Sequence, residues 1–179
     1  MNREIVNMDI KILVMDVDGT LTDGKIYVGT NGELCKAFSV RDGYGIHDIL
    51  IPTGIIPVVV TGRESSIVKN RCAELGITEI HQNANDKVAV LKKILKDKGL
   101  RPHNAAYIGD DLNDLQCMQI ISEAGGILGC PCDAAEKVKA LSDFVAPHNG
   151  GDGAVRDFIE WLMEMNVKGQ DKTSKKDTL

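Results

Sequence analysis

Short aliphatic runs alternate with amphipathic segments along most of this chain, and the alternation limits the folds open to it. The aliphatic runs are expected to be strands, at Ile10–Met15, Pro57–Val60, Glu79–His81, Ala105–Ile108, Gly126–Leu128 and Phe144–Val145. The segments between them are expected to be helices, at 43–51, 64–75, 84–98, 112–123, 134–140 and 154–165. Strands that alternate with helices indicate an α/β domain with a parallel sheet and helices on both faces.

A hairpin is expected to interrupt this alternation directly after the first strand. Lys25–Val28 and Leu34–Val40 flank Gly29-Thr30-Asn31-Gly32, and an Asn-Gly pair between two such runs is typical of a β-hairpin. We therefore expect a hairpin flap over residues 25–40, with no core of its own to cover.

Length and composition suit one domain. The chain has 179 residues, of which 43% are hydrophobic, so residues 1–165 can bury a core, and residues 166–179 are expected to form a polar, mobile tail. The net charge of −5 disfavours binding to nucleic acid or to an anionic membrane. The sequence shows neither a signal segment nor an apolar stretch as long as a membrane span, so we expect a cytoplasmic protein.

The cysteines are scattered and odd in number, at positions 35, 72, 117, 130 and 132. Cys130-Pro131-Cys132 could bind a metal or form a redox pair, but no second Cys/His pair at ligand spacing accompanies it. Reduced cysteines that serve packing in a cytosolic protein are the favoured interpretation.

Polar residues follow three of the expected strands, and ligands of an open parallel sheet bind beyond the carboxyl ends of the strands. These residues and two further cations could share one crevice: Asp16 and Asp18; Thr61-Gly62-Arg63; Gly109-Asp110-Asp111; Lys87 and Arg41. Each motif alone is compatible with an ordinary turn or strand exit. Their joint placement at one edge of the sheet predicts a functional site.

The chemistry that suits these groups is phosphoryl transfer through an acyl phosphate. A Mg²⁺ ion between Asp16 and Asp110 would relieve the repulsion between close carboxylates, and Mg²⁺ prefers oxygen ligands. An oxygen of Asp16 is then free to attack phosphorus. Asp18, two residues further along an extended chain, could protonate the departing oxygen and then take a proton from water. Donors for the transferred phosphoryl group are available from the Thr61 hydroxyl, the Gly62 amide and the Lys87 ammonium.

D-x-D-G-T at 16–20, the strand-terminal Thr61, Lys87 and G-D-D-x-x-D at 109–114 together resemble the haloacid dehalogenase (HAD) superfamily of phosphohydrolases. The resemblance implies a Rossmann-like HAD fold, with Asp16 as nucleophile, Asp18 as acid and base, and Thr61 and Lys87 at the phosphate. It also implies that magnesium is held by Asp16, the Asp18 backbone carbonyl and Asp110. Asp111 and Asp114 would support these ligands without binding the metal directly.

No cap domain fits in this chain. The stretch from Asp18 to Thr61 is consumed by the hairpin and one helix, and that from Thr61 to Lys87 by one helix and one strand. A site without a cap either accepts a macromolecule or borrows its lid from another subunit.

A closer resemblance covers residues from about 10 to 163. DGKIYVGTNGELCKAFSVRDGYGI, TGRESSIVKNRCAELGI, AYIGDDLND and NGGDGAVRDFIEWL are similar to segments of 3-deoxy-D-manno-octulosonate (KDO) 8-phosphate phosphatases. This resemblance implies a small-molecule sugar-acid phosphate as substrate and a homotetramer whose hairpins meet at its centre. The implied substrate-binding residues are Asp18, Ser39, Val40, Arg41, Asp42, Gly43, His47, Arg63 and Arg71. Arginine forks suit an anionic keto acid, although His47 stands where close relatives would have arginine.

Three alternatives stay open at this point. Phosphatases of nonulosonate 9-phosphates tend to have glutamate after the Thr-Gly pair, so Arg63 favours the eight-carbon acid. Receiver domains of signalling systems also gather acids, Thr and Lys at a sheet edge, but their phosphorylated Asp follows a middle strand, and they lack an acid/base such as Asp18. A catalytically inactive structural homologue is the third alternative. A phosphoenzyme that lasts seconds indicates a phosphatase, whereas one that lasts minutes indicates a switch.

Overall fold

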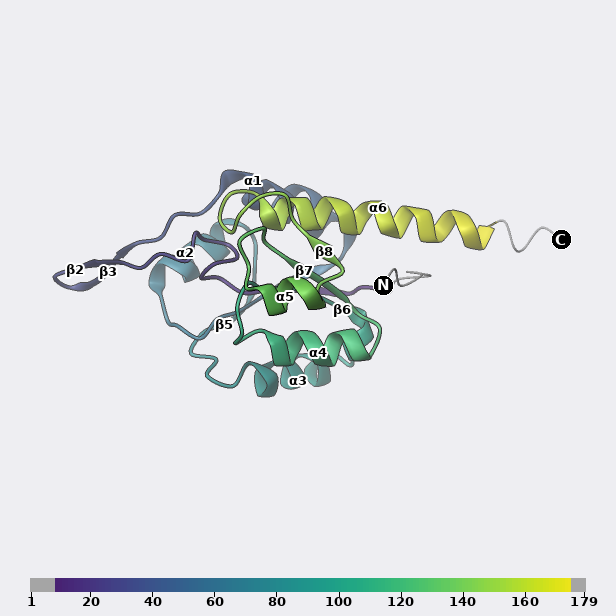
Figure 1. Ribbon diagram of the computed structural model, residues 1–179, viewed down its shortest axis with the longest axis horizontal. Helices are drawn as coiled ribbons and strands as arrows, with labels where there is room; N and C mark the ends of the chain where they lie inside the picture. Colours follow the sequence, from purple (N-terminus) through teal and green to yellow (C-terminus); the bar gives the residue numbers. More distant parts are fainter. Residues whose placement is uncertain (1–8, 175–179) are drawn as a thin grey trace.

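The computed structural model describes residues 9–174, and for residues 166–174 it describes the helical backbone. Six parallel strands form the main sheet, in the order β5-β4-β1-β6-β7-β8 (Figure 1). Their bounds are β1 (Ile12–Met15), β4 (Ile56–Val60), β5 (Glu79–His81), β6 (Ala105–Ile108), β7 (Ile127–Cys130) and β8 (Phe144–Val145). The six expected strands and their parallel arrangement are thus confirmed, with small shifts at the ends of β1, β4 and β7.

Strand β1 lies at the centre of the sheet, paired with β4 on one side and with β6 on the other. All four of its residues are buried, because helices cover both faces. Leu13 and Met15 point into one hydrophobic core, and Ile12 and Val14 into the other. The continuous apolar character of the strand follows from this double burial.

Each core belongs to one layer of helices, and the two layers cover opposite faces of the sheet. The first layer contains α1 (Val40–Tyr44), α2 (Ser66–Glu74) and α6 (Ala154–Ser174). The second contains α3 (Lys87–Asp97), α4 (Leu115–Glu123) and α5 (Glu136–Leu141). None of the helices in the described part of the chain has the length and apolar character needed to cross a bilayer.

Two helical expectations need correction. The single helix expected over 43–51 is divided into α1, a π-helix over Gly45–Leu50 and a 3₁₀-helix over Ile51–Thr53. Pro52 lacks a backbone N–H and so cannot continue an α-helical hydrogen-bond ladder, which agrees with the end of the helical segment at Thr53. Helix α6 continues to Ser174, past the expected boundary at 165, so part of the stretch expected to be a tail is helical.

The hairpin consists of β2 (Tyr27–Gly29) and β3 (Gly32–Cys35) and projects from the body of the molecule (Figure 1). Its existence is confirmed, but its turn is formed by Thr30-Asn31 and not by the Asn-Gly pair. Gly32 instead follows the turn at φ 107°, a backbone conformation that suits glycine. Large apolar side chains are left in solvent, with Val28 71% and Leu34 70% exposed.

All five cysteines are free, as expected. Cys72, Cys117 and Cys130 are buried, which agrees with a packing role, whereas Cys35 and Cys132 are exposed and the packing interpretation is wrong for them. Among the described residues, the group that could hold a metal ion contains carboxylates and no cysteine.

Candidate active site

Three carboxylates meet beyond the carboxyl ends of β1 and β6. Asp16 follows β1 directly, and its backbone N–H donates to the carbonyl oxygen of Ile108, the last residue of β6, at 3.1 Å. One oxygen each of Asp16, Asp110 and Asp114 lies within 4.8 Å of the others. The sheet-edge rule therefore placed Asp16 and Asp110 correctly in one site.

Lys87 joins this cluster from the first position of α3. Its Nζ lies 2.9 Å from Asp16 Oδ1 and 2.8 Å from Asp114 Oδ1. Asp86 caps the helix by accepting the Ala89 amide at 2.9 Å, which fixes the start of α3 at this point. Burial disfavours the charged lysine, but the carboxylates of Asp16 and Asp114 outweigh burial and raise its pKa. Lys87 is thus a fixed positive charge beside Asp16.

Asp114 supports its neighbours rather than standing free. Besides Lys87, its carboxylate accepts the Tyr107 hydroxyl at 2.7 Å and the amides of Asp110 and Asp111 at 3.2 and 3.5 Å. A Cβ on Gly109 would lie 2.5 Å from the Asp114 carboxyl carbon, so this position requires glycine. With its oxygens engaged by four donors, Asp114 is less suited than Asp16 and Asp110 to hold a cation.

Asp110 is oriented by the D-G-T segment that follows β1. The Thr20 hydroxyl donates to Asp110 Oδ1 at 3.0 Å. Gly19 has φ 97°, and a Cβ at this residue would lie 2.0 Å from Asp110 Oδ2. The glycine and the threonine of this motif therefore make room for Asp110 and hold it.

The cluster carries more negative charge than Lys87 alone offsets. Burial raises the pKa of Asp16, and the charge of Asp114 raises it further. Burial and the charge of Asp16 raise the pKa of Asp110 to about 7. A divalent cation with a preference for oxygen ligands would remove this conflict. Asp16 and Asp110 therefore fit a magnesium ion.

Asp18 lies in a second charged group beside the first. The Lys36 ammonium donates to Asp18 Oδ1 and also lies 3.1 Å from Glu33 Oε1. Arg63 also approaches this group, with its Nε 3.9 Å from Asp18 Oδ2 and its Nη2 3.7 Å from Glu33 Oε1. The side chains of Glu33 and Lys36 come from the hairpin and its base, so the hairpin reaches the site.

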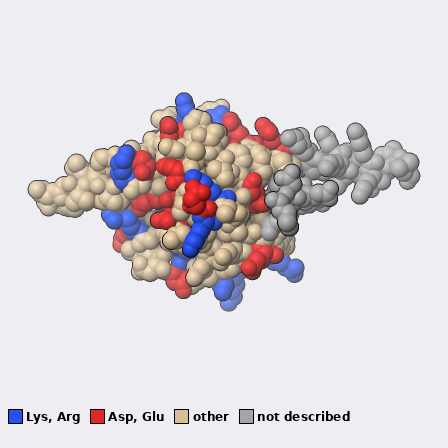
Figure 2. Space-filling model, viewed as in Figure 1, with Lys and Arg blue, Asp and Glu red and all other residues tan. Residues whose placement is uncertain are grey.

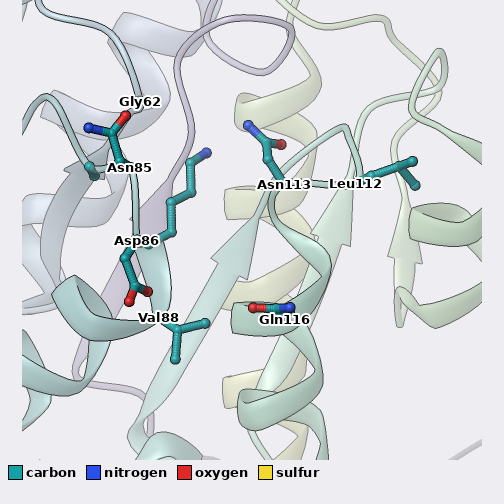
Figure 3. Close-up of a pocket in the computed structure, with 9 residues that line it drawn as sticks. Gly62, Asn85, Asp86, Val88, Leu112, Asn113 and Gln116 are labelled. Carbon is teal, nitrogen blue, oxygen red and sulfur yellow. The ribbon is translucent and has the colours of Figure 1, made fainter.

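The expected phosphate-binding residues lie on adjoining loops. Thr61 follows β4 and is buried; its amide donates to the His81 carbonyl, and its own carbonyl accepts the Ala84 amide. Gly62 and Lys87 line a pocket of about 490 Å³. Figure 3 shows Asn85 and Asp86 on one side of this pocket and Asn113 and Gln116 on the other. Space for a ligand thus lies directly beside the lysine.

Three of the expected substrate-binding residues meet at the start of α1. Ser39 caps this helix by accepting the Arg41 amide at 3.2 Å. Arg71 Nη2 lies 3.5 Å from the Ser39 carbonyl oxygen, and its Nη1 pairs with Glu74 at 2.8 Å. A Cβ on Gly43 would lie 2.5 Å from Arg71 Nη2, so the lack of a side chain at Gly43 leaves room for the Arg71 guanidinium against α1.

Asp42 turns into the protein, unlike its neighbour Arg41. It is buried and accepts the amides of Gly153 and Arg156 at 3.3 and 2.9 Å, at the start of α6. Burial raises its pKa to about 6. Arg41 is exposed, and its Nη1 lies 3.4 Å from His148 Nε2. Asp42 thus anchors the N-terminal end of α6 through these two backbone amides.

The remaining candidates are exposed. Val40 stands in solvent, and half of the Arg63 side chain is accessible. His47 lies 3.3 Å from the neighbouring Asp48, and Asp111 accepts the amide of Leu112 at 2.8 Å. Figure 2 shows acidic and basic side chains close together on the body of the molecule, while the projecting end of the hairpin carries neither.

Comparison with known proteins identifies the family. Residues 73–159 match the haloacid dehalogenase-like hydrolase family. Over 155 residues, the chain is 41% identical to the 3-deoxy-D-manno-octulosonate 8-phosphate phosphatase KdsC of Escherichia coli K12, a match that covers 87% of this chain and 80% of that protein. The chain belongs to the KDO 8-phosphate phosphatase family.

Solved structures of this family share the fold. The KDO 8-phosphate phosphatase of Moraxella catarrhalis, in complex with magnesium, phosphate and KDO, has a TM-score of 0.83 and 36% identity, with 94% of each chain covered. The cobalt-bound enzyme of Haemophilus influenzae has a TM-score of 0.82 and 36% identity, with 90% of this chain and 92% of that one covered. The resemblance read from the sequence, and the fold it implied, are confirmed.

Sequence reasoning missed several residues that shape the site of this family member. Tyr107 belongs to an expected apolar strand, and the signal for its role is that a buried phenol usually has a hydrogen-bond partner. Lys36 follows β3 directly and is buried, although Leu34 two residues earlier is 70% exposed, so strand alternation carries no signal for its burial. Thr20 carried no signal beyond its place in the motif.

Proposed function

We propose that this protein is a magnesium-dependent phosphatase that hydrolyses KDO 8-phosphate to KDO and phosphate through an aspartyl phosphate on Asp16. The observation that carries the proposal is the position of Asp16, with its carboxylate beside Lys87 and Asp110 in a buried cluster. The membership of the KDO 8-phosphate phosphatase family supports the choice of substrate.

The proposed reaction uses the carboxyl groups of Asp16 and Asp18. An oxygen of Asp16 attacks phosphorus while the bond to the sugar oxygen breaks, and Asp18 gives its proton to that oxygen. Asp18 then takes a proton from the water that attacks the phosphorus of the aspartyl phosphate, which releases phosphate and restores Asp16. Magnesium held by Asp16, the Asp18 carbonyl and Asp110 supplies positive charge to the carboxylates and the phosphoryl oxygens.

The phosphoryl group is held by donors that are already fixed in the protein. Lys87 keeps its charge because the surrounding carboxylates raise its pKa. The Thr61 hydroxyl and the Gly62 amide complete the set. Preorganised donors of this kind stabilise the charge that spreads over the phosphoryl oxygens in the transition state. We assign Asp111 and Asp114 to the support of these groups.

The sugar acid is assigned to the surface above the phosphate site. Arg63 and Arg41 are the exposed cations available for its carboxylate, and arginine forks suit this anion. The ion-pair contacts of Arg63 with Asp18 and Glu33 are 3.9 and 3.7 Å long, so its side chain can turn toward a ligand at little cost. The other residues assigned to the sugar acid are Ser39, Val40, Asp42, Gly43, His47 and Arg71.

Phosphate release from three esters tests the proposal: KDO 8-phosphate, a nonulosonate 9-phosphate and glucose 6-phosphate. KDO 8-phosphate should give the highest kcat/KM, and EDTA should abolish turnover until Mg²⁺ is added. Asp16→Asn should lose all turnover, while Asp18→Asn should be about 10²–10⁴-fold slower. Asp97→Asn, on the exposed face of α3, is the control and should match the wild type.

Other results would contradict the proposal in different ways. A preference for the nine-carbon ester would contradict KDO 8-phosphate as the substrate, and full activity in EDTA would contradict the requirement for magnesium. A phosphoenzyme that lasts for minutes would indicate a signalling switch. Equal, mild losses in Asp16→Asn and Asp18→Asn would indicate an acidic turn without a catalytic role.

We further propose a cytoplasmic homotetramer in which hairpins of sister subunits meet and narrow the entrance to each site. The hairpin exposes Ile26, Val28 and Leu34, and its projecting end is uncharged (Figure 2). Burial of this surface against other copies would stabilise it. Light scattering should give a tetramer for the wild type, and a variant with Ile26→Lys and Val28→Glu should give smaller species. A monomeric wild type with full sugar-acid activity would contradict this assembly.

A further inference from the structure

Lys36 is a buried cation at the base of an otherwise exposed hairpin. Its side chain is 1% exposed. A buried ammonium is costly unless carboxylates pair with it, and Lys36 has two such partners. It donates to Asp18 Oδ1 and lies 3.1 Å from Glu33 Oε1. The position of Lys36 is therefore fixed by charge as well as by packing.

The two oxygens of Asp18 have different surroundings as a result. Oδ1 is held by the Lys36 ammonium. Oδ2 is 3.9 Å from Arg63 Nε, which is longer than a hydrogen bond. Because Lys36 restrains one oxygen, rotation of the carboxyl group is restrained too. Oδ2 is then the atom that can exchange a proton with the substrate.

Glu33 ties this arrangement to the start of α2. The Ser65 hydroxyl donates to Glu33 Oε2, and the Ser65 amide donates to Gln82 Oε1 at 2.6 Å. Ser65 is buried and is the N-cap residue of α2. Glu33 and Lys36 thus connect the base of the hairpin to Asp18 on one side and to the body of the protein on the other.

Lys36 and Arg63 differ in what they can do for the reaction. Both are cations near Asp18 and Glu33, but Arg63 is half-exposed and its ion-pair distances are 3.7 and 3.9 Å. Arg63 can leave these partners for an anionic ligand, whereas Lys36 is enclosed and closely paired. The buried lysine can therefore hold Asp18 in place while the arginine responds to substrate.

We propose that Lys36 is a positioning residue that holds the Asp18 carboxyl so that Oδ2 faces the leaving oxygen, and that Glu33 in turn holds Lys36. The proposal rests on the proposed function, because it requires Asp18 to be the proton donor. It also means that a displaced hairpin misplaces the acid, so the flap contributes to catalysis through this contact as well as by covering the site.

Single-turnover kinetics on two esters test the positioning role. KDO 8-phosphate loses a basic alkoxide that needs a proton, whereas p-nitrophenyl phosphate loses a stabilised phenolate that does not. For Lys36→Met, we expect release of KDO in the first step to slow by about 10- to 100-fold, in keeping with a partial loss of general acid catalysis. Release of p-nitrophenolate should slow by less than about threefold, because this leaving group needs no proton. Lys36→Arg should recover most of the rate.

A double-mutant cycle shows whether Lys36 acts through Asp18. In an Asp18→Asn background, Lys36→Met should change the alkoxide step by less than about twofold, because coupled residues are not additive. Lys25→Met is the matched control: this lysine is on the same hairpin, pairs with Asp23 at 3.1 Å and is exposed. It should match the wild type. If Lys36→Met does not fold, Glu33→Gln should show the same selectivity between the esters with a smaller loss.

Three results would overturn the positioning role alone. The first is an equal loss on both esters, and the second is a full additional loss in the Asp18→Asn background. The third is a wild-type rate for Lys36→Met while Asp18→Asn is slow, which would leave the proposed function intact. A wild-type rate for Asp18→Asn would refute the proton-donor role itself, and the positioning role with it.

Discussion

Removal of the positive charge at position 87 should destabilise the fold by several kcal/mol. Lys87→Met keeps a long, unbranched side chain but leaves three carboxylates together, Asp16, Asp110 and Asp114. The lysine side chain is 5% exposed and lies within 2.9 Å of two of them. When one partner of a buried ion pair is removed, stability falls by about 3–5 kcal/mol, since the other charge stays buried.

The loss should depend on pH in a defined direction. In the folded wild type, burial already raises the pKa of Asp16, while Lys87 lowers it. Without the lysine, that pKa rises further. A carboxyl whose folded-state pKa is raised contributes stability at low pH that is lost as pH rises through the raised value. Lys87→Met should therefore cost more at pH 8 than at pH 5, where a carboxyl can bind a proton.

Urea unfolding in EDTA, at pH 5 and at pH 8, measures both effects. The control is Lys98→Met, which removes a partly exposed pair with Glu79 at 2.9 Å and should cost less than about 1 kcal/mol at either pH. Added Mg²⁺ should restore part of the stability of Lys87→Met, because binding to the folded state stabilises it. A cost below about 1 kcal/mol at pH 8, or an equal cost at both pH values, would refute the account of a buried carboxylate cluster held by Lys87.

Three further substitutions test single contacts. Asp42→Asn should remove part of the pH dependence of stability, because burial raises the folded-state pKa of Asp42 from 3.8 to about 6. As pH rises through this window, the wild type should lose up to about 3 kcal/mol of unfolding free energy relative to the variant, as measured by urea unfolding. Gly19→Ala should abolish Mg²⁺-dependent thermal stabilisation, because its Cβ would collide with Asp110; an unchanged shift in Tm would contradict this. Tyr107→Phe should cost about 1–3 kcal/mol in thermal unfolding, since Asp114 loses a buried donor, and a neutral effect would show that other donors replace the phenol.

The strands and the carboxylate cluster could be predicted because the signals for them are local. A run such as Ile12–Met15 is apolar at every position, and a parallel sheet fixes which end of each strand carries the ligands. The order of motifs then brings Asp16 and Asp110 together whatever the details of the helices between them. These features depend on pattern and topology alone.

The features that sequence missed depend on three-dimensional packing. The burial of Lys36 cannot be predicted from the hairpin sequence, because it depends on Asp18, 18 residues earlier in the chain, as well as on Glu33 of β3. The inward turn of Asp42 depends on the start of α6, far along the chain. The π-helix over Gly45–Leu50 likewise reflects how the segment packs, and periodicity cannot distinguish it from an α-helix.

The central position of β1 has a consequence for the kinetics of folding. Its neighbours in the sheet are β4 and β6, so the groups around Asp16 come from segments that are remote in sequence; Thr20 and Asp110 are 90 residues apart. Contacts with large sequence separation form late and slowly, because loop closure precedes them. A chain that has collapsed without β6 in register lacks both Asp110 and the support of Asp114. Recovery of enzymatic activity during refolding should therefore lag behind the recovery of helix, and would report completion of the central sheet.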